Sequence, residues 1–337
     1  MRGAIGPVDG AATDLLGSAT SEAPIGDGTP AASCRAVPSA FAIVAAMDRP
    51  EQDSQRQRNT PTSPLGVWWL GRTAYRDAWD LQHRVVAARV AGLVGDQLLL
   101  LEHEPVLTLG RHSDPSHVVA TPGELSARGI ELIQTERGGE VTYHGPGQLT
   151  GYVIVKLVDR GLLVRPLVRA LESALADTCA SFGVAAGPKQ DYPGCWCGDG
   201  SRKIGAVGVR IERGVSYHGV ALNVTARLAD FELIDACGMP DVESTSIDRE
   251  LGLASAPSTE SVGRAAAAFA VALAGALGAP LLGAIPPLAE PGAVRTELEA
   301  LLAGLTPSAA PEEAPAAGPA IEPAIASAIE PGAGRAY

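Results

Sequence analysis

Apolar residues recur at helical spacing in several segments of the chain. The segments 74–91 and 164–182 place an apolar side chain every three or four residues, which favours one buried helix face. An alanine-rich segment follows later, with Ser258 or Thr259 available as its N-cap and Gly278 near its end. We therefore predict a helix over each of these segments.

Shorter apolar runs predict β-strands between the helices. They lie at residues 67–70, 97–101, 106–109, 131–135, 140–143 and 149–157. Apolar residues also alternate on both sides of the turn Arg213-Gly214, so residues 203–224 predict a β-hairpin. Groups of strands separated by helices indicate an α/β (α+β) domain with a mixed β-sheet flanked by helices.

This apolar pattern is confined to the middle of the chain, so we predict one folded domain over residues 65–279. Residues 1–64 are rich in Ala, Gly, Ser, Pro and Thr, and they bury too little apolar surface to offset the entropy of ordering. We expect them to be disordered, with Met47 as an alternative start. Residues 280–337 are predicted to be an Ala/Pro-rich tail, mostly disordered, with a short helix near 293–304.

Charge and hydropathy argue against two classes of partner, nucleic acid and a membrane, although an acidic total does not exclude a local basic face. The chain carries 26 Lys and Arg against 38 Asp and Glu, and it has no basic stretch of the kind that binds nucleic acid. The uncharged segment 265–289 is long enough to span a membrane, but prolines at 280, 286 and 287 interrupt it, so we predict a soluble helix instead. No N-terminal segment resembles a signal peptide, and we expect a cytoplasmic protein.

The cysteines indicate a reducing compartment, because their number is odd and no secretory signal accompanies them. They are Cys34, Cys179, Cys195, Cys197 and Cys237. Cys195 and Cys197 have the spacing of half a metal site, but no second Cys or His pair completes it. We therefore predict no metal.

Three glycine-containing islands interrupt the apolar pattern. Residues 137–152 read RGGEVTYHGPGQLTGY, which is either a hairpin loop or a binding wall whose glycines give space to a substrate. The second island combines RKIGAVGVRI at 202–211 with YHGVALNV at 217–224, and the third is ACGMP at 236–240. Each joins glycine to a reactive or polar side chain, which turns alone do not explain.

Four side chains in these islands are candidates for chemistry. Cys237 is either a buried apolar residue or a nucleophile, and a nearby cation would favour the reactive thiolate. Lys203 is one of only three lysines beside 23 arginines, and lysine can lose its proton when partly buried. It is otherwise a solvated hairpin lysine. His144 and His218 both occur in Tyr-His-Gly, which suggests paired walls of one pocket or two hydrogen-bonded core residues.

At these residues the chain resembles the lipoyl(octanoyl) transferases, the octanoyl-[acyl-carrier-protein]:protein N-octanoyltransferases. The resemblance covers roughly residues 66–255 and rests on RGGEVTYHGPGQLTGY, RKIGAVGVR, SYHGVALNV and ACGM in this order. It implies the fold of the biotin and lipoate protein ligase catalytic domains. It also implies that the domain over 65–279 transfers an octanoyl group from octanoyl-acyl carrier protein to a lipoyl-domain lysine, without a cofactor.

The resemblance also implies roles for particular residues. Cys237 is the expected acyl acceptor, and Lys203 is expected to lower the pKa of its thiol or to move its proton. The expected substrate-binding residues come from three segments: Arg137, Gly138, Gly139, Glu140, Val141, Thr142, Tyr143 and His144; Ala206, Val207 and Gly208; Gly219, Val220 and Ala221. The expected acceptors are the lipoyl domains of 2-oxoacid dehydrogenase complexes and the glycine cleavage H protein, and the expected enzyme is a monomer.

Two other functions fit the same residues less well. A ligase of the same fold would activate lipoate or biotin with ATP, but the pairing of Lys203 with Cys237 argues against it. A non-catalytic scaffold would bind an acylated carrier or a lipoyl domain without turnover, but both reactive side chains are retained. ATP dependence identifies the first, and binding without turnover identifies the second.

Overall fold

The computed structural model of the chain describes residues 63–111, 113–235, 242–254, 256–283 and 291–305. The predictions of disorder for residues 1–64 and for most of 280–337 concern segments that are almost entirely outside these ranges. Cys237 and its island at 236–240 are outside them as well. The fold and the site described below are built from the described residues.

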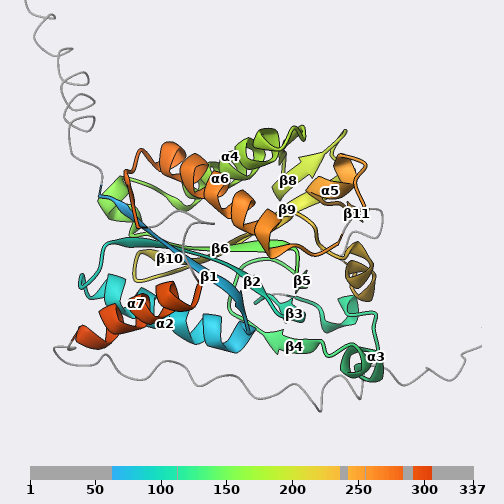
Figure 1. Cartoon of the computed structure of the whole chain (residues 1–337), viewed down its shortest axis with the longest axis horizontal. Coiled ribbons are helices and arrows are strands. Elements are labelled where there is room, and N and C mark those ends of the chain that lie inside the picture. The colour runs from blue at the N-terminus through green and yellow to red at the C-terminus, as the bar shows by residue number, and fades with distance from the viewer. Residues whose placement is uncertain (1–62, 112, 236–241, 255, 284–290, 306–337) are drawn as a thin grey trace, which may run out of the picture. The chain divides into compact units, whose positions relative to one another are not determined.

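A mixed β-sheet forms the centre of the fold (Figure 1), as the sequence predicts. Its strand order is β12 (Leu281–Leu282), β1 (Leu65–Thr73), β2 (Asp96–His103), β6 (Gln148–Ile154), β10 (Val215–Asn223), β9 (Arg202–Glu212), β8 (Tyr192–Cys197) and β7 (Ala186–Lys189), and β11 (Glu243–Ser244) pairs with β9. Parallel pairs join β1 to β2 and to β12, and antiparallel pairs run from β2 to β7. The predicted hairpin over 203–224 is the β9–β10 pair.

A smaller, three-stranded sheet lies beside the central one. It consists of β4 (Glu131–Gln134), β3 (Val106–Leu109) and β5 (Thr142–His144). The glycine-rich stretch leaves this sheet through β5 and enters the central sheet through β6, and the two strands do not pair. A hairpin loop is therefore the wrong interpretation of this stretch, because it links two sheets.

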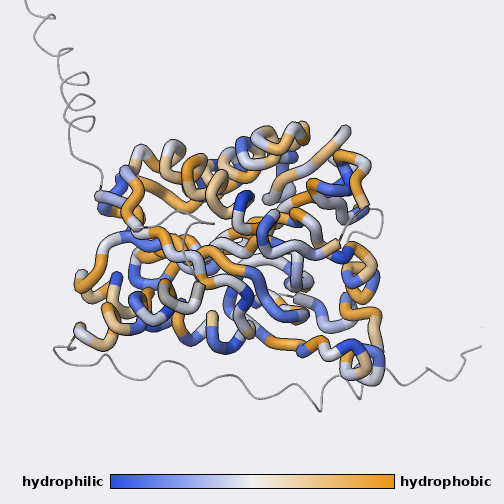
Figure 2. The backbone as a smooth tube through the Cα atoms, viewed as in Figure 1, coloured by the Kyte–Doolittle hydropathy of each residue, from blue (hydrophilic) through white to orange (hydrophobic). Residues whose placement is uncertain are grey.

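Helices cover both faces of the central sheet (Figure 1). One face carries α4 (Val164–Ser181) and α6 (Thr259–Leu277), whose apolar side chains pack with those of the sheet in the largest core cluster. The other carries α2 (Tyr75–Val90) and α7 (Pro291–Gly304), which share a second cluster. In Figure 2, apolar residues recur at intervals along α4 and α6 and run through the central strands. The predicted helices near these positions are confirmed.

The remaining elements are short. They are α3 (Pro122–Ala127), α5 (Ile247–Glu250) and 3₁₀ turns at Pro115–His117, Leu157–Arg160 and Leu228–Leu233. Several strand boundaries differ from the prediction: β1 and β2 are longer at both ends, β5 begins at Thr142, and β6 ends at Ile154. Of the helices in the described ranges, only α6 is long and apolar enough to cross a membrane, and half of its most apolar window is buried within the fold.

The caps of α6 explain its limits. The Ser258 hydroxyl accepts a hydrogen bond from the backbone N–H of Ser261 at 3.2 Å, which satisfies one free donor of the first turn. Gly278 ends the helix in a left-handed conformation with φ of 61°, which glycine adopts at little cost. Of the two cap residues that the sequence offers, Ser258 is the one used.

Candidate active site

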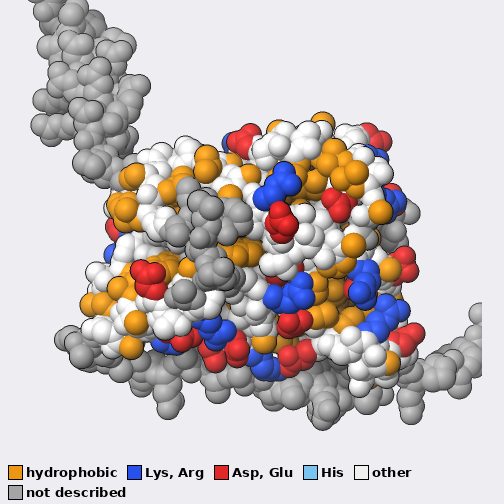
Figure 3. Space-filling view, viewed as in Figure 1, with side chains coloured by type: hydrophobic (Ala, Val, Ile, Leu, Met, Phe, Trp, Pro, Cys, Tyr) orange, Lys and Arg blue, Asp and Glu red, His pale blue; other side chains and the backbone are white. Residues whose placement is uncertain are grey.

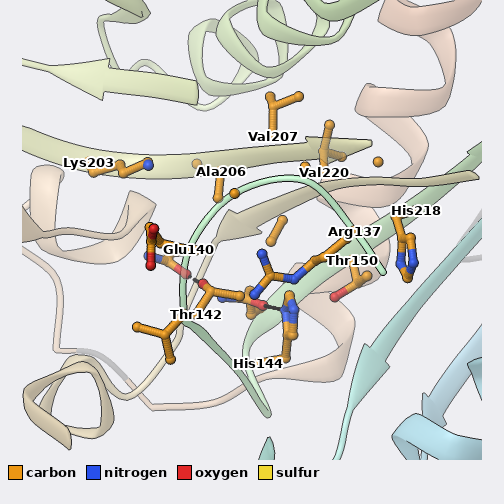
Figure 4. A pocket seen from close by; sticks show the side chains of 18 of the residues that line it. Arg137, Glu140, Thr142, His144, Thr150, Lys203, Ala206, Val207, His218 and Val220 are labelled. Carbon is orange, nitrogen blue, oxygen red and sulfur yellow. Dashed lines mark hydrogen bonds between the residues drawn. The ribbon is translucent and has the colours of Figure 1, made fainter. Parts of the chain in front are cut away.

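A cavity lies where the glycine-rich segment faces strands β6, β9 and β10 (Figure 4). It brings together the first two islands of the sequence, at 137–152 and 202–224, which are well separated along the chain. The predicted site residues that line it are Arg137, Gly138, Gly139, Glu140, Val141, Thr142, His144, Lys203, Ala206, Val207, Gly208, Gly219, Val220 and Ala221. The sequence therefore identified most of the cavity wall.

Arg137 lines the cavity but also braces the glycine segment against the small sheet. Its side chain is buried, and Nη2 donates to the backbone oxygen of Thr108 at 2.6 Å and to its hydroxyl at 2.9 Å. Nε donates to the same hydroxyl at 3.2 Å. Charged donors of this kind make strong hydrogen bonds in a buried setting. Arg137 thus fixes the position of residues 137–139 relative to β3.

The glycines of the wall serve the packing of the protein backbone. A Cβ atom on Gly208 would lie 2.8 Å from the backbone oxygen of Gly138, and one on Gly110 would lie 1.9 Å from that of Gly139. The N–H of Gly138 also donates to the oxygen of Val209 at 3.3 Å. At Gly208 the backbone of Gly138 occupies the space that a side chain would need, so the close approach of the two backbones requires glycine there.

Tyr143 does not line the cavity, although it is in the middle of the motif. Successive side chains of a strand point to opposite faces, so Tyr143 points away from the side of Thr142 and His144. Its hydroxyl donates to Asp230 Oδ2 at 2.9 Å within the core of the small sheet. Burial and the nearby Asp230 carboxylate raise the pKa of Tyr143. Tyr143 therefore supports the wall from behind.

Glu140 has partners outside the cavity as well as a place in its wall. Its Oε2 accepts hydrogen bonds from the backbone N–H of Asp114 at 3.3 Å and from His117 Nδ1 at 3.2 Å. These contacts tie the glycine segment to the 3₁₀ turn at Pro115–His117. The neighbouring Val141 is buried in the core cluster of the small sheet. Residues 140 and 141 of the wall are therefore held by the 3₁₀ turn and by the core of the small sheet.

The hydrogen bonds of Gln148 define the tautomer of His144. Gln148 Nε2 donates to the backbone oxygen of Tyr143 at 3.1 Å and to Asn223 Oδ1 at 2.9 Å. Gln148 Oε1 is therefore an acceptor, and His144 Nδ1, 2.7 Å away, must carry the proton that it receives. Burial and His103 lower the pKa of His144 well below its ordinary value. His144 is consequently neutral, with Nε2 as an acceptor.

His218 is held in an unusual backbone conformation. Its φ is +54°, in the left-handed region that few residues other than glycine adopt. The N–H of His218 donates to Gln82 Oε1 at 2.7 Å, and its Nε2 lies 3.2 Å from Glu136 Oε1. Burial lowers the pKa of His218, so the neutral ring donates from Nε2 to the carboxylate. The ring lines the inner part of the cavity (Figure 4).

Glu136 joins this part of the wall to α2. The same Oε1 that faces His218 lies 2.8 Å from His83 Nε2 and accepts from Trp79 Nε1 at 3.1 Å. Burial favours the protonated acid, but the donors His218 and His83 outweigh it and lower the pKa of Glu136. No sequence pattern indicates this role, because the partners of Glu136 come from distant elements.

Lys203 lies on β9 at the end of the cavity opposite His218 (Figure 4). Its Nζ is 5.1 Å from the ring centroid of Trp196 on β8, within the range of a cation–π contact. The backbone oxygen of Lys203 accepts from the N–H of Thr245 at 3.0 Å, which fixes the strand next to β11. Phe231 and Ser244, the lining residues on either side of segment 236–241 in the sequence, contribute to the same wall. Cys237 itself lies outside the described residues.

The cysteines of β8 belong to the protein core. Cys195 and Cys197 are buried in the largest core cluster together with Cys179 of α4. A hydrogen bond with Cys195 and burial raise the pKa of the Cys179 thiol. Over the ranges that the structure describes, no group of three or more His, Cys, Asp or Glu could hold a metal ion. These thiols therefore act as small apolar side chains.

The fold is that of lipoate protein ligases. A lipoate-protein ligase A bound with ATP superposes with a TM-score of 0.51 at 13% identity, over 72% of this chain and 94% of that one. A bi-partite lipoate protein ligase from Thermoplasma acidophilum superposes with a TM-score of 0.51 at 14% identity, over 72% of this chain and 93% of that one. At these identities the likeness concerns the fold alone.

The sequence places the chain in a family. Residues 74–270 match the lipoyl protein ligase A/B catalytic domain, and the chain belongs to this family. An octanoyltransferase of Chloroflexus aurantiacus is 47% identical over 193 residues, which are 57% of this chain and 86% of the relative. An octanoyltransferase of Acidobacterium capsulatum is 46% identical over 198 residues, which are 56% and 80%. The similarity to these octanoyltransferases identifies the chain as an acyltransferase.

Proposed function

We propose that the chain transfers an octanoyl group from octanoyl-acyl carrier protein to a lysine of a lipoyl domain, through a thioester on Cys237. The Cys237 thiolate attacks the carrier thioester, and the pantetheine thiol leaves with a proton. The amine of the target lysine then attacks the acyl-enzyme, an amide forms, and the Cys237 thiol is restored. The first step exchanges one thioester for another, and the second makes a more stable amide, so ATP is not required.

The composition of the cavity carries this proposal. Lys203 stands at one end, and the wall beside it includes the small apolar residues Ala206 and Ala221, while the side chains of Val207 and Val220 pack in the core on the other face of the sheet. Each methylene of an octanoyl chain gains about 0.8 kcal/mol on burial against such a wall, although immobilisation reduces what reaches the affinity. Phe231 and Ser244 line the same cavity on either side of the Cys237 segment in sequence. This arrangement suits a short acyl chain beside a lysine and a cysteine.

Lys203 has two roles in this proposal. As an ammonium it stabilises the Cys237 thiolate, whose unperturbed pKa of about 8.5 would leave only a small fraction ionised at neutral pH. As an amine it accepts a proton from the incoming nucleophile. Lys203→Arg keeps the charge and removes easy deprotonation, so we expect it to form the acyl-enzyme but to transfer slowly to the acceptor. Full transfer activity of this variant would exclude the proton-transfer role.

The partners follow from the same proposal. The donor is octanoyl-acyl carrier protein, and the acceptors are lipoyl domains of 2-oxoacid dehydrogenase complexes and the glycine cleavage H protein. We propose a monomer that acts in the cytoplasm on these protein substrates. On the face shown in Figure 3, basic and acidic side chains lie next to one another, and such a surface does not favour a polyanion such as nucleic acid.

The experiment combines the full-length chain with octanoyl-acyl carrier protein and an isolated lipoyl domain, without ATP. We expect the lipoyl domain to gain the mass of one octanoyl group. A gain that requires ATP and free lipoate or biotin would instead identify a ligase of the same fold. Binding of either protein without any mass gain would identify a scaffold.

A further inference from the structure

One face of strand β6 carries polar side chains into the cavity. Gln148, Thr150 and Tyr152 alternate along the strand, and all three line the cavity and are buried. Leu149 and Val153, at the alternate positions of the same strand, point to the other face, into the largest core cluster. The wall that β6 contributes to the cavity is therefore polar along this strand.

Only Thr150 of these three side chains lacks a hydrogen-bond partner within the described part of the chain. Gln148 bonds to His144, Tyr143 and Asn223, and the Tyr152 hydroxyl lies 2.8 Å from His103 Nε2. Thr150 is 2% exposed, and no described residue is a hydrogen-bond partner of its Oγ1. Buried hydroxyls are normally hydrogen-bonded, so an unpaired one in a cavity wall calls for an explanation.

Thr150 and Lys203 lie far apart in the cavity. Thr150 pairs across the sheet with Ala221, which pairs with Ala206, so these residues form one row over three strands. Lys203 precedes Ala206 by three residues on β9, about 10 Å along the strand. In Figure 4, Ala206 lies between the Lys203 end and the Thr150 end, where His144 and His218 also lie.

We propose that the Thr150 hydroxyl limits the length of the acyl chain that the cavity accepts. This inference rests on the proposed octanoyl transfer and names a specificity-determining residue for it. An acyl chain attached at the Lys203 end runs along the apolar wall and brings its methyl end towards Thr150. A longer chain presses methylenes against a hydroxyl that they cannot hydrogen-bond, so the cavity selects against it.

The test replaces the hydroxyl by a methyl group of nearly the same shape. Thr150→Val should raise the ratio of kcat/KM for dodecanoyl-carrier to that for octanoyl-carrier by about tenfold, because an unpaired buried hydroxyl disfavours an apolar neighbour by about that factor. Decanoyl-carrier should give an intermediate change. Thr150→Ser keeps the hydroxyl and is the matched control, and it should keep the wild-type order of chain lengths.

The results distinguish a failure of the proposed octanoyl transfer from a failure of the proposed role of Thr150. If the wild-type chain does not octanoylate the lipoyl domain, the proposed function fails before any variant is compared. If it does, a Thr150→Val profile that is unchanged, or lowered equally for every chain length, overturns the role of Thr150. Thermal unfolding checks the fold of each variant. Thr150→Ala removes the same hydroxyl and takes the place of the valine variant if that protein does not fold.

Discussion

His103 makes the stability of the site region sensitive to acid. It is buried on β2 under the cavity wall, with Nδ1 3.1 Å from the Thr73 oxygen and Nε2 2.8 Å from the Tyr152 hydroxyl. Burial lowers the pKa of His103 from 6.5 to about 4, and His218 adds to this effect. The folded protein therefore keeps this ring neutral at pH values where an unfolded chain binds a proton.

The sign and size of the effect follow from this pKa. Above pH 6.5 neither state is protonated at His103, so its contribution to the free energy of unfolding is fully present. As the pH falls from 6.5 towards 4, only the unfolded state gains the proton and stability is lost. At about 1.4 kcal/mol for each pH unit, the complete loss is about 3 kcal/mol, and about 2 kcal/mol of it occurs between pH 7 and pH 5.

The assay is urea unfolding of the wild type and of His103→Gln at a series of pH values. The variant loses ring packing at every pH, so the test is the slope against pH and not the absolute stability. We expect the fall in the free energy of unfolding between pH 7 and pH 5 to be smaller in the variant by about 2 kcal/mol. Equal falls in both proteins would refute the reasoning that His103 is held neutral by burial.

Two further substitutions test the packing of the wall and of the core. Gly208→Ala should destabilise the protein by about 1–3 kcal/mol and slow transfer, because its Cβ meets the Gly138 oxygen at 2.8 Å. Gly187→Ala, where no atom lies within 4 Å of the added Cβ, is the matched control. An equal fall in the midpoint of thermal unfolding for both variants would contradict this explanation. Ser258→Ala should cost about 1 kcal/mol in urea unfolding through loss of the α6 N-cap, and an unchanged midpoint would exclude that cap.

The elements that the sequence predicted are those with a strong apolar period. The segment 164–182 became α4 at Val164–Ser181, and 203–224 became the β9–β10 hairpin. Strand β8 was missed because Tyr192–Cys197 contains proline, glycine and two cysteines in place of alternating aliphatic residues. Its cysteines, whose spacing matches only half a metal site, supply the apolar side chains that an alternating pattern would have shown.

The site was predicted as contiguous motifs, and strand geometry corrects this description. A motif of consecutive residues cannot turn every side chain to one cavity, so Tyr143 lies behind the wall while Thr142 and His144 line it. Thr150 could have been noticed from the polar alternation along β6. Its importance depends on the absence of a partner in the folded structure, and no sequence pattern shows that.

Arg137 and Glu136 illustrate a second limit. Arg137 is in a motif for which a substrate contact is predicted, and Glu136 precedes it, but their hydrogen-bond partners include Thr108 on β3 and side chains of α2 and β10, which no motif indicates. Such contacts depend on how the two sheets meet. No local sequence pattern predicts how the two sheets pack against each other, because that packing involves segments far apart in the chain.

The central claim is that Cys237 carries the acyl group. Intact-mass spectrometry of the full-length chain after incubation with octanoyl-acyl carrier protein, without an acceptor, tests this claim most directly. We predict a gain of one octanoyl group on the wild type and none on Cys237→Ala, with hydroxylamine removing the adduct as expected for a thioester. An undiminished adduct on Cys237→Ala would contradict the account.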